Sequence, residues 1–359
     1  MHKREGTRHQ SGQPKLLVLE GETMKKKIAL MLAVMLVAVM FVACANTDKP
    51  ADPKPTETVE VTPTPEATPE AVPESTTDTT TEISDDVITI TDMTGREITI
   101  DGPVTSIVAL SPADCEILFT LLAGDLIIGR GEYCNYPPAV LDVPSVETGY
   151  QLNVEQVIAL NPQVIIMTSM AQSEEQVAAL EAAGAKVVVI SAHDIEGTYQ
   201  AIGIIGQLTG DPVMASGLVA AMKDDFANIE RMADGDGSKT VYFEVSPLEW
   251  GLWTAGSGTF MDELATMLGL TNAFADVEGW GAVSQEQVIE RDPDYIVTIA
   301  MYFGEGALPV DEILSRSGWE NMKAIKNGAV YNADNDAVAR PGPRLADAAK
   351  SLYDFVYGE

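Results

Sequence analysis

One ten-residue pattern occurs twice in this chain, and it constrains the fold more than any other sequence feature. It occupies 153–162 and, in closely similar form, 284–293. In each copy a capping residue, Asn153 or Ser284, precedes a short helix that ends at a proline. An apolar segment typical of a buried strand follows each copy. The repeat therefore predicts two similar halves, each containing a helix that leads into a strand.

Short strands and helices also alternate around these copies. Residues 87–90 and 97–100 alternate apolar and polar side chains about a Thr-Gly turn, which predicts a hairpin. A buried strand at 107–110 leads into a helix, for which Ser111 is the expected cap and Pro112 the first residue. This order predicts an α/β fold with mostly parallel sheets.

A longer helix separates the two halves. Asp211 and Pro212 predict its start, and apolar positions at helical spacing carry it to about Met232. We interpret this segment as the link between two lobes. A long, stiff link permits only a modest opening of the space between the lobes.

The amino-terminal part has the layout of a secretory leader. Lys25 to Lys27 precede an apolar run over 28–43, which is shorter than a membrane-spanning helix requires. Cys44 follows this run and resembles the cysteine of a bacterial lipobox, which predicts a lipid anchor. The alternative is a plain secretory peptide cut near Ala43 or Ala45, which would leave an ordinary thiol.

Composition divides the chain into segments with different expected roles. The Thr-, Pro- and Glu-rich stretch after Cys44 has almost no large apolar side chain, so it cannot bury enough surface to fold. The expected segments are a misassigned start (1–23), a signal peptide (24–43), a lipidated cysteine with a disordered tether (44–86), a first lobe (87–205), a connecting helix (206–235) and a second lobe (236–359).

Charge and missing motifs exclude several function classes. A formal net charge of −32 opposes binding to a phosphate backbone, so we expect no nucleic acid partner. His193 is the only histidine after Met24, so a His-rich metal site cannot form, and we interpret it as an ordinary loop histidine. Nucleophile elbows, phosphate-binding loops and dinucleotide fingerprints are absent, which disfavours an enzyme. Cys115 and Cys134 either pair or remain free thiols.

Several motifs in a fixed order resemble one known family. They are the strand and turn at 107–112, the segment 129–138, the repeated helices, the segment 280–284 and the Arg-Pro-Gly-Pro-Arg segment at 340–344. Together they resemble the iron-siderophore and cobalamin binding proteins of ABC importers. This resemblance implies two Rossmann-like lobes joined by one long helix, the class III solute-binding architecture. It also implies a monomeric extracytoplasmic protein that performs no catalysis, holds no cofactor of its own and delivers a ligand to membrane permease subunits.

Candidate site residues follow from strand ends and from the resemblance. Loops leaving the strand ends, where the lobes face each other, should contact the ligand. The expected ligand contacts are Ser111, Tyr133, Asn135, Tyr150, Trp250, Trp253, Trp280, Tyr302 and Arg340. In cobalamin-binding members a glutamate on each lobe docks into arginines of the permease, and these positions match Glu155 and Glu286.

The expected ligand is an iron complex, namely a ferric siderophore. Two tryptophans of the cobalamin pocket align here with Gly149 and Thr168, so a corrinoid is the second candidate and haem the third. Two other classes stay open: a surface adhesion or structural module on a stalk, and a cofactor-dependent enzyme built on the same lobes.

Overall fold

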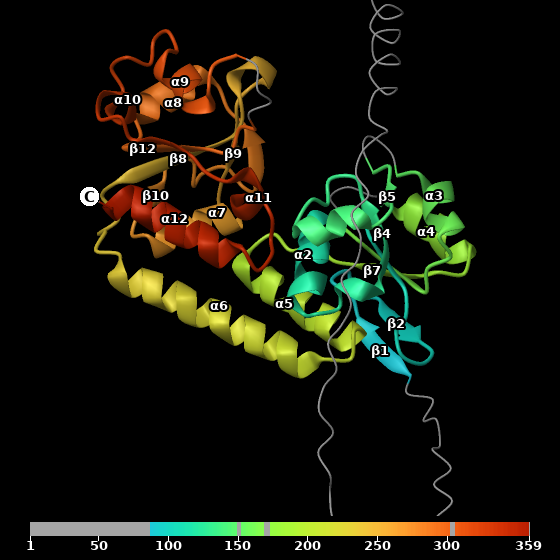
Figure 1. Ribbon diagram of the computed structural model, residues 1–359. Helices are drawn as coiled ribbons and strands as arrows, with labels where there is room; N and C mark the ends of the chain where they lie inside the picture. The colour runs from blue at the N-terminus through green and yellow to red at the C-terminus, as the bar shows by residue number, and fades with distance from the viewer. Residues whose placement is uncertain (1–86, 149–151, 169–172, 302–305, 359) are drawn as a thin grey trace, which may run out of the picture. The chain divides into compact units, whose positions relative to one another are not determined.

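The computed structural model describes residues 87–148, 152–168, 173–301 and 306–358, and they contain two main sheets (Figure 1). The first sheet has the order β5-β4-β3-β6-β7, and all its strands are parallel. Its strands are β3 (Ile107–Ala109), β4 (Ile127–Gly131), β5 (Ser145–Val146), β6 (Val164–Met167) and β7 (Lys186–Val189). The expected hairpin is present as β1 (Ile88–Thr91) and β2 (Glu97–Ile100).

The second sheet has the order β11-β9-β8-β12-β13, with β10 beside β8. Its strands are β8 (Thr240–Ser246), β9 (Trp253–Ala255), β10 (Thr271–Asn272), β11 (Trp280–Ala282), β12 (Tyr295–Thr298) and β13 (Val330–Asn332). The pairs β8-β12, β12-β13 and β8-β10 are parallel, whereas β9 and β11 form an antiparallel edge. The prediction of mostly parallel sheets is confirmed.

Helices pack on both faces of these sheets (Figure 1). The α-helices of the described residues are α2 (Pro112–Thr120), α3 (Val154–Ala159), α4 (Glu174–Ala182), α5 (Ile195–Leu208), α6 (Pro212–Met232), α7 (Phe260–Met267), α8 (Gln285–Arg291), α9 (Pro309–Leu314), α10 (Lys323–Lys326), α11 (Asn335–Val338) and α12 (Leu345–Tyr357). Short 3-10 helices are η2 (Gly124–Leu126), η3 (Pro138–Asp142) and η4 (Leu248–Trp250). Within the described residues, no helix combines the length and the apolar character that a bilayer crossing requires.

The repeated sequence pattern forms the same local structure in both lobes. Asn153 Oδ1 accepts a hydrogen bond from the N–H at N3 of α3 at 3.1 Å, and Ser284 Oγ does the same for α8 at 3.3 Å. At the other end Asn161 and Asp292 have positive φ angles of 51° and 44°. Asn and Asp tolerate this left-handed conformation better than most residues, and each precedes the proline that stops the helix. The expected caps are confirmed.

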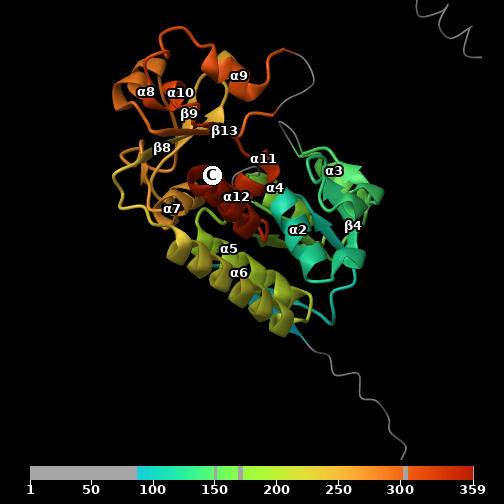
Figure 2. The ribbon, with the colours of Figure 1, turned by 60° about the vertical axis from the view of Figure 1, so that its left-hand side comes forward.

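Helix α6 joins the two lobes, as expected. Asp211 caps it by accepting a hydrogen bond from the Met214 N–H at 2.8 Å, and the helix lies within the predicted segment 206–235. It packs against α5 near its start and against α7 and α12 further along, and both views show it beside α5 (Figures 1 and 2). Met222 and Phe226 are buried in a core that continues through both lobes. Burial of each such side chain stabilises the fold by roughly 1.5–3 kcal/mol, so the link is firmly held.

Candidate functional site

A cavity of about 300 Å³ lies between residues of the two lobes. The first lobe contributes the start of α2, Thr168 after β6 and the segment 190–193 after β7. The second lobe contributes the start of α7, Trp280 on β11, and residues of α11 and the turn after it. Most of these segments follow the carboxyl ends of parallel strands, which is where α/β proteins bind small molecules.

The start of α2 forms a polar part of the cavity wall. Ser111 occupies the cap position, but its side chain makes no capping hydrogen bond, so that part of the expectation is wrong. Asp114 lies in the first turn, lines the cavity and is only 2% exposed. Its Oδ2 has no hydrogen-bond partner among the described residues. Burial raises the pKa of Asp114 from 3.8 to about 8, because desolvation disfavours the charged carboxylate.

An aromatic pair forms the opposite wall. Trp280 and Phe260 pack edge to face, with ring centroids 5.6 Å apart. The Phe260 N–H donates to the His193 carbonyl at 3.0 Å, which ties this wall to the first lobe. The side chain of His193 is exposed and lines the cavity. The cavity therefore offers both flat apolar surface and a polar imidazole.

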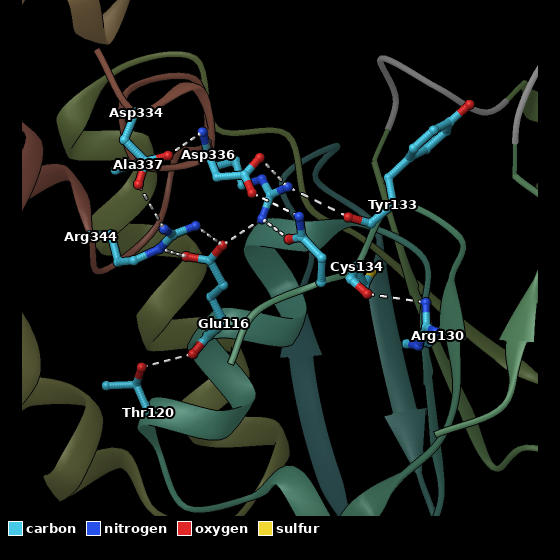
Figure 3. A network of polar contacts seen from close by, with 11 residues as sticks. Glu116, Thr120, Arg130, Tyr133, Cys134, Asp334, Asp336, Ala337 and Arg344 are labelled. Carbon is cyan, nitrogen blue, oxygen red and sulfur yellow. Dashed lines mark hydrogen bonds and ion pairs between the residues drawn. The ribbon is translucent and has the colours of Figure 1, made fainter. Parts of the chain in front are cut away.

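Charged side chains beside the cavity join the two lobes (Figure 3). Arg340 Nη1 donates to Glu116 Oε1 at 2.9 Å and to Asn135 Oδ1 at 2.8 Å. Its Nη2 donates to Asp336 Oδ1 at 2.6 Å. Arg344 donates to both oxygens of Glu116, at 2.8 and 2.6 Å. One carboxylate of α2 thus binds two guanidinium groups of the second lobe.

This network neutralises the positive charge of the cavity. Glu116 is 2% exposed, so its ion pairs with Arg340 and Arg344 are partly desolvated and geometrically fixed. Hydrogen bonding to Glu116 raises the pKa of Arg344 above its ordinary value. Among the described residues that line the cavity, Arg340 is the one lysine or arginine. Since carboxylates already surround it, the cavity presents no uncompensated fixed positive charge.

A second cavity of about 360 Å³ lies within the first lobe. Its wall includes the turn of the β1-β2 hairpin and one side of α4, with an ion pair between Arg96 and Glu181 at 2.9 Å. Only one lobe contributes to it. We therefore place the candidate site in the cavity between the lobes.

The two-lobed architecture and the cavity between the lobes agree with comparisons to known proteins. Residues 107–337 match the family model described as periplasmic binding protein. The chain belongs to this family. The binding protein is 32% identical over 340 residues to the uncharacterized ABC transporter substrate-binding lipoprotein YvrC of Bacillus subtilis, which covers 93% of the chain and 98% of the relative.

Other relatives of the binding protein include proteins named for their ligands. It is 30% identical over 249 residues to the vitamin B12-binding protein of Salmonella paratyphi A, covering 68% of the chain and 88% of the relative. It is 31% identical to the structure of a possible iron-binding (periplasmic solute-binding) protein from Staphylococcus epidermidis, with a TM-score of 0.62 and coverage of 71% and 99%. The binding protein is thus an extracytoplasmic substrate-binding protein of the ABC importer family. The expected family, class III fold and non-enzymatic character are confirmed.

Four predicted ligand residues of the binding protein lie in or beside the cavity. Ser111, Trp280 and Arg340 line it. Asn135 lies next to it and bridges two residues of the second lobe, because its amide accepts from Arg340 and donates to Asp336 Oδ2 at 2.8 Å. Their contact with a ligand stays a prediction.

The other five predicted ligand residues are not among the described residues that line the cavity. Tyr133 is 63% exposed, and its ring points away from the charged network (Figure 3). Trp250 and Trp253 are 65% and 44% exposed, at the end of η4 and the start of β9. Tyr150 and Tyr302 lie outside the described residues. No role in binding is established for any of these side chains.

Three residues near the cavity of the binding protein escaped the sequence reasoning. No sequence motif singled out Asp114 or Glu116. His193, interpreted as an ordinary loop residue, follows β7 and faces the cavity. Loops that leave the carboxyl ends of strands were expected to contact the ligand, which is why Ser111 after β3 was chosen. His193 follows β7 in the same way and met the same criterion.

The predicted docking glutamates lie at equivalent positions of the two lobes. Glu155 is in the first turn of α3 and Glu286 in that of α8, and both are exposed. The pKa of Glu286 is lowered, because its carboxylate accepts hydrogen bonds from the Glu286 backbone N–H and from the Ser284 hydroxyl. Cys44, the predicted lipidation site, lies outside the described residues.

Cys115 and Cys134 are free thiols, which resolves the two alternatives left by the sequence. Both are buried, and both sulfur atoms contact the Ala109 carbonyl oxygen, at 3.7 and 3.9 Å. A hydrogen bond with Cys134 and burial together raise the pKa of Cys115.

Proposed function

We propose that this binding protein captures a corrinoid between its lobes and delivers it to the permease of an ABC importer. The observation that carries the proposal is the compensated charge of the cavity. Arg340 is already paired with Glu116 and Asp336, so an anionic ligand would have to displace a carboxylate. Cyanocobalamin is uncharged overall and carries many neutral amide groups, so it suits such a cavity.

The walls of the cavity and the relatives support the same ligand. Trp280 and Phe260 provide flat apolar surface, and aromatic faces bury a large area at a small cost in rotamer entropy. The Salmonella relative, 30% identical, is named for vitamin B12. The net charge of −32 also disfavours polyanionic ligands through the long-range field.

An uncharged iron chelate is the second candidate. The sequence placed a ferric siderophore first, and a neutral ferric hydroxamate meets the same charge requirement as a corrinoid. The Staphylococcus epidermidis relative, titled as iron-binding, favours this candidate. Haem is less suited, because its propionates would compete with Glu116 for Arg340.

Delivery requires an anchor and a docking surface. We assign docking to Glu155 and Glu286, since their exposed carboxylates occupy equivalent places on the two lobes and could form bidentate pairs with arginine. We assign the lipid anchor to Cys44. The relative from Bacillus subtilis, which is named a lipoprotein, supports this assignment.

A ligand panel tests the proposal. The full chain is titrated with cyanocobalamin, a neutral ferric hydroxamate, an anionic ferric catecholate and haem, and binding is followed by calorimetry and thermal unfolding. At a hundred times its dissociation constant, cyanocobalamin should stabilise the fold by about 2.7 kcal/mol. Trp280→Ala should weaken this binding about tenfold, whereas Val213→Ala, exposed on α6, should not.

Other outcomes point to the remaining candidates. Stabilisation by the hydroxamate alone would favour the iron chelate. Tight binding of haem or the catecholate without cyanocobalamin would overturn the charge argument. Absence of any ligand effect would overturn the corrinoid proposal and mean that the protein carries a ligand of another class.

A further inference from the structure

The carboxyl group of Asp114 is an unpaired acceptor in the wall of the cavity. It is 2% exposed, and its Oδ2 makes no hydrogen bond within the described residues. Leaving a buried acceptor unpaired costs about 1–3 kcal/mol, and folded proteins avoid this at most positions. Asp114 lines the cavity, so a molecule bound there lies next to the residue whose acceptor the protein leaves unpaired.

Hydrogen-bond donors lie next to this acceptor. The first turn of any α-helix has backbone N–H groups without partners inside the helix, and here the Ser111 side chain does not cap them. Ser111, Ala113 and Asp114 all line the cavity. The start of α2 therefore offers open donors and an open acceptor on one wall.

Neighbouring charged groups do not compensate Asp114. Arg340 lines the same cavity, but its hydrogen bonds go to Glu116, Asn135 and Asp336. The His193 ring nitrogen lies 3.4 Å from the Ser191 hydroxyl. Burial also raises the pKa of Asp114 to about 8, because it disfavours the charged carboxylate. A neutral ligand group therefore suits the Asp114 carboxyl better than a cation, which would require the charged form.

We propose that Asp114 and the first turn of α2 form a subsite for a primary carboxamide of the ligand. The ligand's amide N–H donates to the Asp114 carboxyl, and the amide carbonyl accepts from a backbone N–H of the helix start. A primary amide is a neutral group that offers a donor and an acceptor at once. The assignment rests on the proposed function, since corrinoids carry such amides around the macrocycle.

Single-amide changes in the ligand test this subsite. The full chain is titrated with cyanocobalamin and with each monocarboxylic acid obtained by hydrolysing one of its propionamides. At pH 9, where Asp114 is ionised, the wild-type chain should bind one of these acids about tenfold more weakly than the parent, because a ligand carboxylate cannot donate to the Asp114 carboxylate. Asp114→Asn should reduce this difference to about twofold, since an amide side chain can donate to the ligand carboxylate.

Two variants complete the design. Asp114→Ala should weaken binding of the parent about tenfold. Asp125→Asn, an exposed change on η2, should keep both the wild-type affinity and the discrimination between parent and acids. If Asp114→Ala does not fold, Asp114→Asn alone tests the subsite, because Asn and Asp side chains have nearly the same shape.

The outcomes separate this subsite from the proposed function. If the wild-type chain binds cyanocobalamin and every acid equally well, or if both Asp114 variants keep wild-type affinity and discrimination, the subsite is refuted and the function stands. If the wild-type chain binds no corrinoid at all, the function has failed and the subsite falls with it.

Discussion

At the residue scale, Asp114 combines a functional position with a cost in stability. Burial raises its pKa from 3.8 to about 8, so the folded protein binds this proton more tightly than the unfolded chain does. Below about pH 4 both states are protonated and no penalty arises. Between about pH 4 and 8 the unfolded chain loses the proton first, so stability must fall as the pH rises.

This predicts a pH-dependent difference between the wild-type chain and Asp114→Asn. The variant should become increasingly more stable relative to wild type as the pH rises to about 8, by at most about 1.4 kcal/mol per pH unit, and the difference should level off above that. Urea unfolding at several pH values measures it, with Asp125→Asn as the control. A difference independent of pH would mean that Asp114 is not desolvated as described.

At the element scale, the repeated helices α3 and α8 present their glutamates in the same way. Their caps hold the first turns in place, which directs Glu155 and Glu286 to solvent at fixed positions. We expect Glu155→Ala combined with Glu286→Ala to abolish uptake in cells carrying the native importer. Ligand affinity should be unchanged, because neither side chain lines the cavity.

A matched pair of changes controls for lost charge. Glu175→Ala combined with Glu290→Ala removes two exposed acids from α4 and α8, and it should leave uptake near the wild-type rate. Uptake by the Glu155 and Glu286 double variant at that same rate would exclude these residues from docking.

At the scale of the whole molecule, Glu116 connects the lobes. Removing one partner of a desolvated ion pair leaves the other charge uncompensated, so Glu116→Gln should lower the unfolding free energy by about 3 kcal/mol. It should also increase the radius of gyration measured by small-angle X-ray scattering, because the lobes lose their main polar connection. Glu230→Gln, exposed on α6, serves as the control. Equal stability and equal size in both variants would contradict this role.

This connection bears on ligand entry. A corrinoid is larger than the cavity of about 300 Å³, so a bound corrinoid would extend beyond the cavity unless the lobes separate. The long helix α6 limits that movement, and the bonds from Arg340 and Arg344 to Glu116 resist it. These contacts therefore hold the two lobes together in the free chain.

Much of the architecture was predictable, because local rules decide it. The caps at Asn153, Ser284 and Asp211, and the strands that follow the repeated helices, depend on neighbours a few residues away. The site was predictable only in part. Ser111, Trp280 and Arg340 line the cavity. Trp250 and Trp253 have the same side chain as Trp280, but they lie elsewhere on the described surface.

The sequence by itself determined the α/β order, the duplication, the connecting helix and the family, because these depend on periodicity, capping and motif order along the chain. Only the tertiary structure decided that Glu116 meets Arg340, 224 residues away, and that Asp114 stays unpaired beside the cavity. The reason is physical: partner choice and desolvation depend on which atoms the packed lobes bring within a few ångströms, and no local pattern encodes that distance.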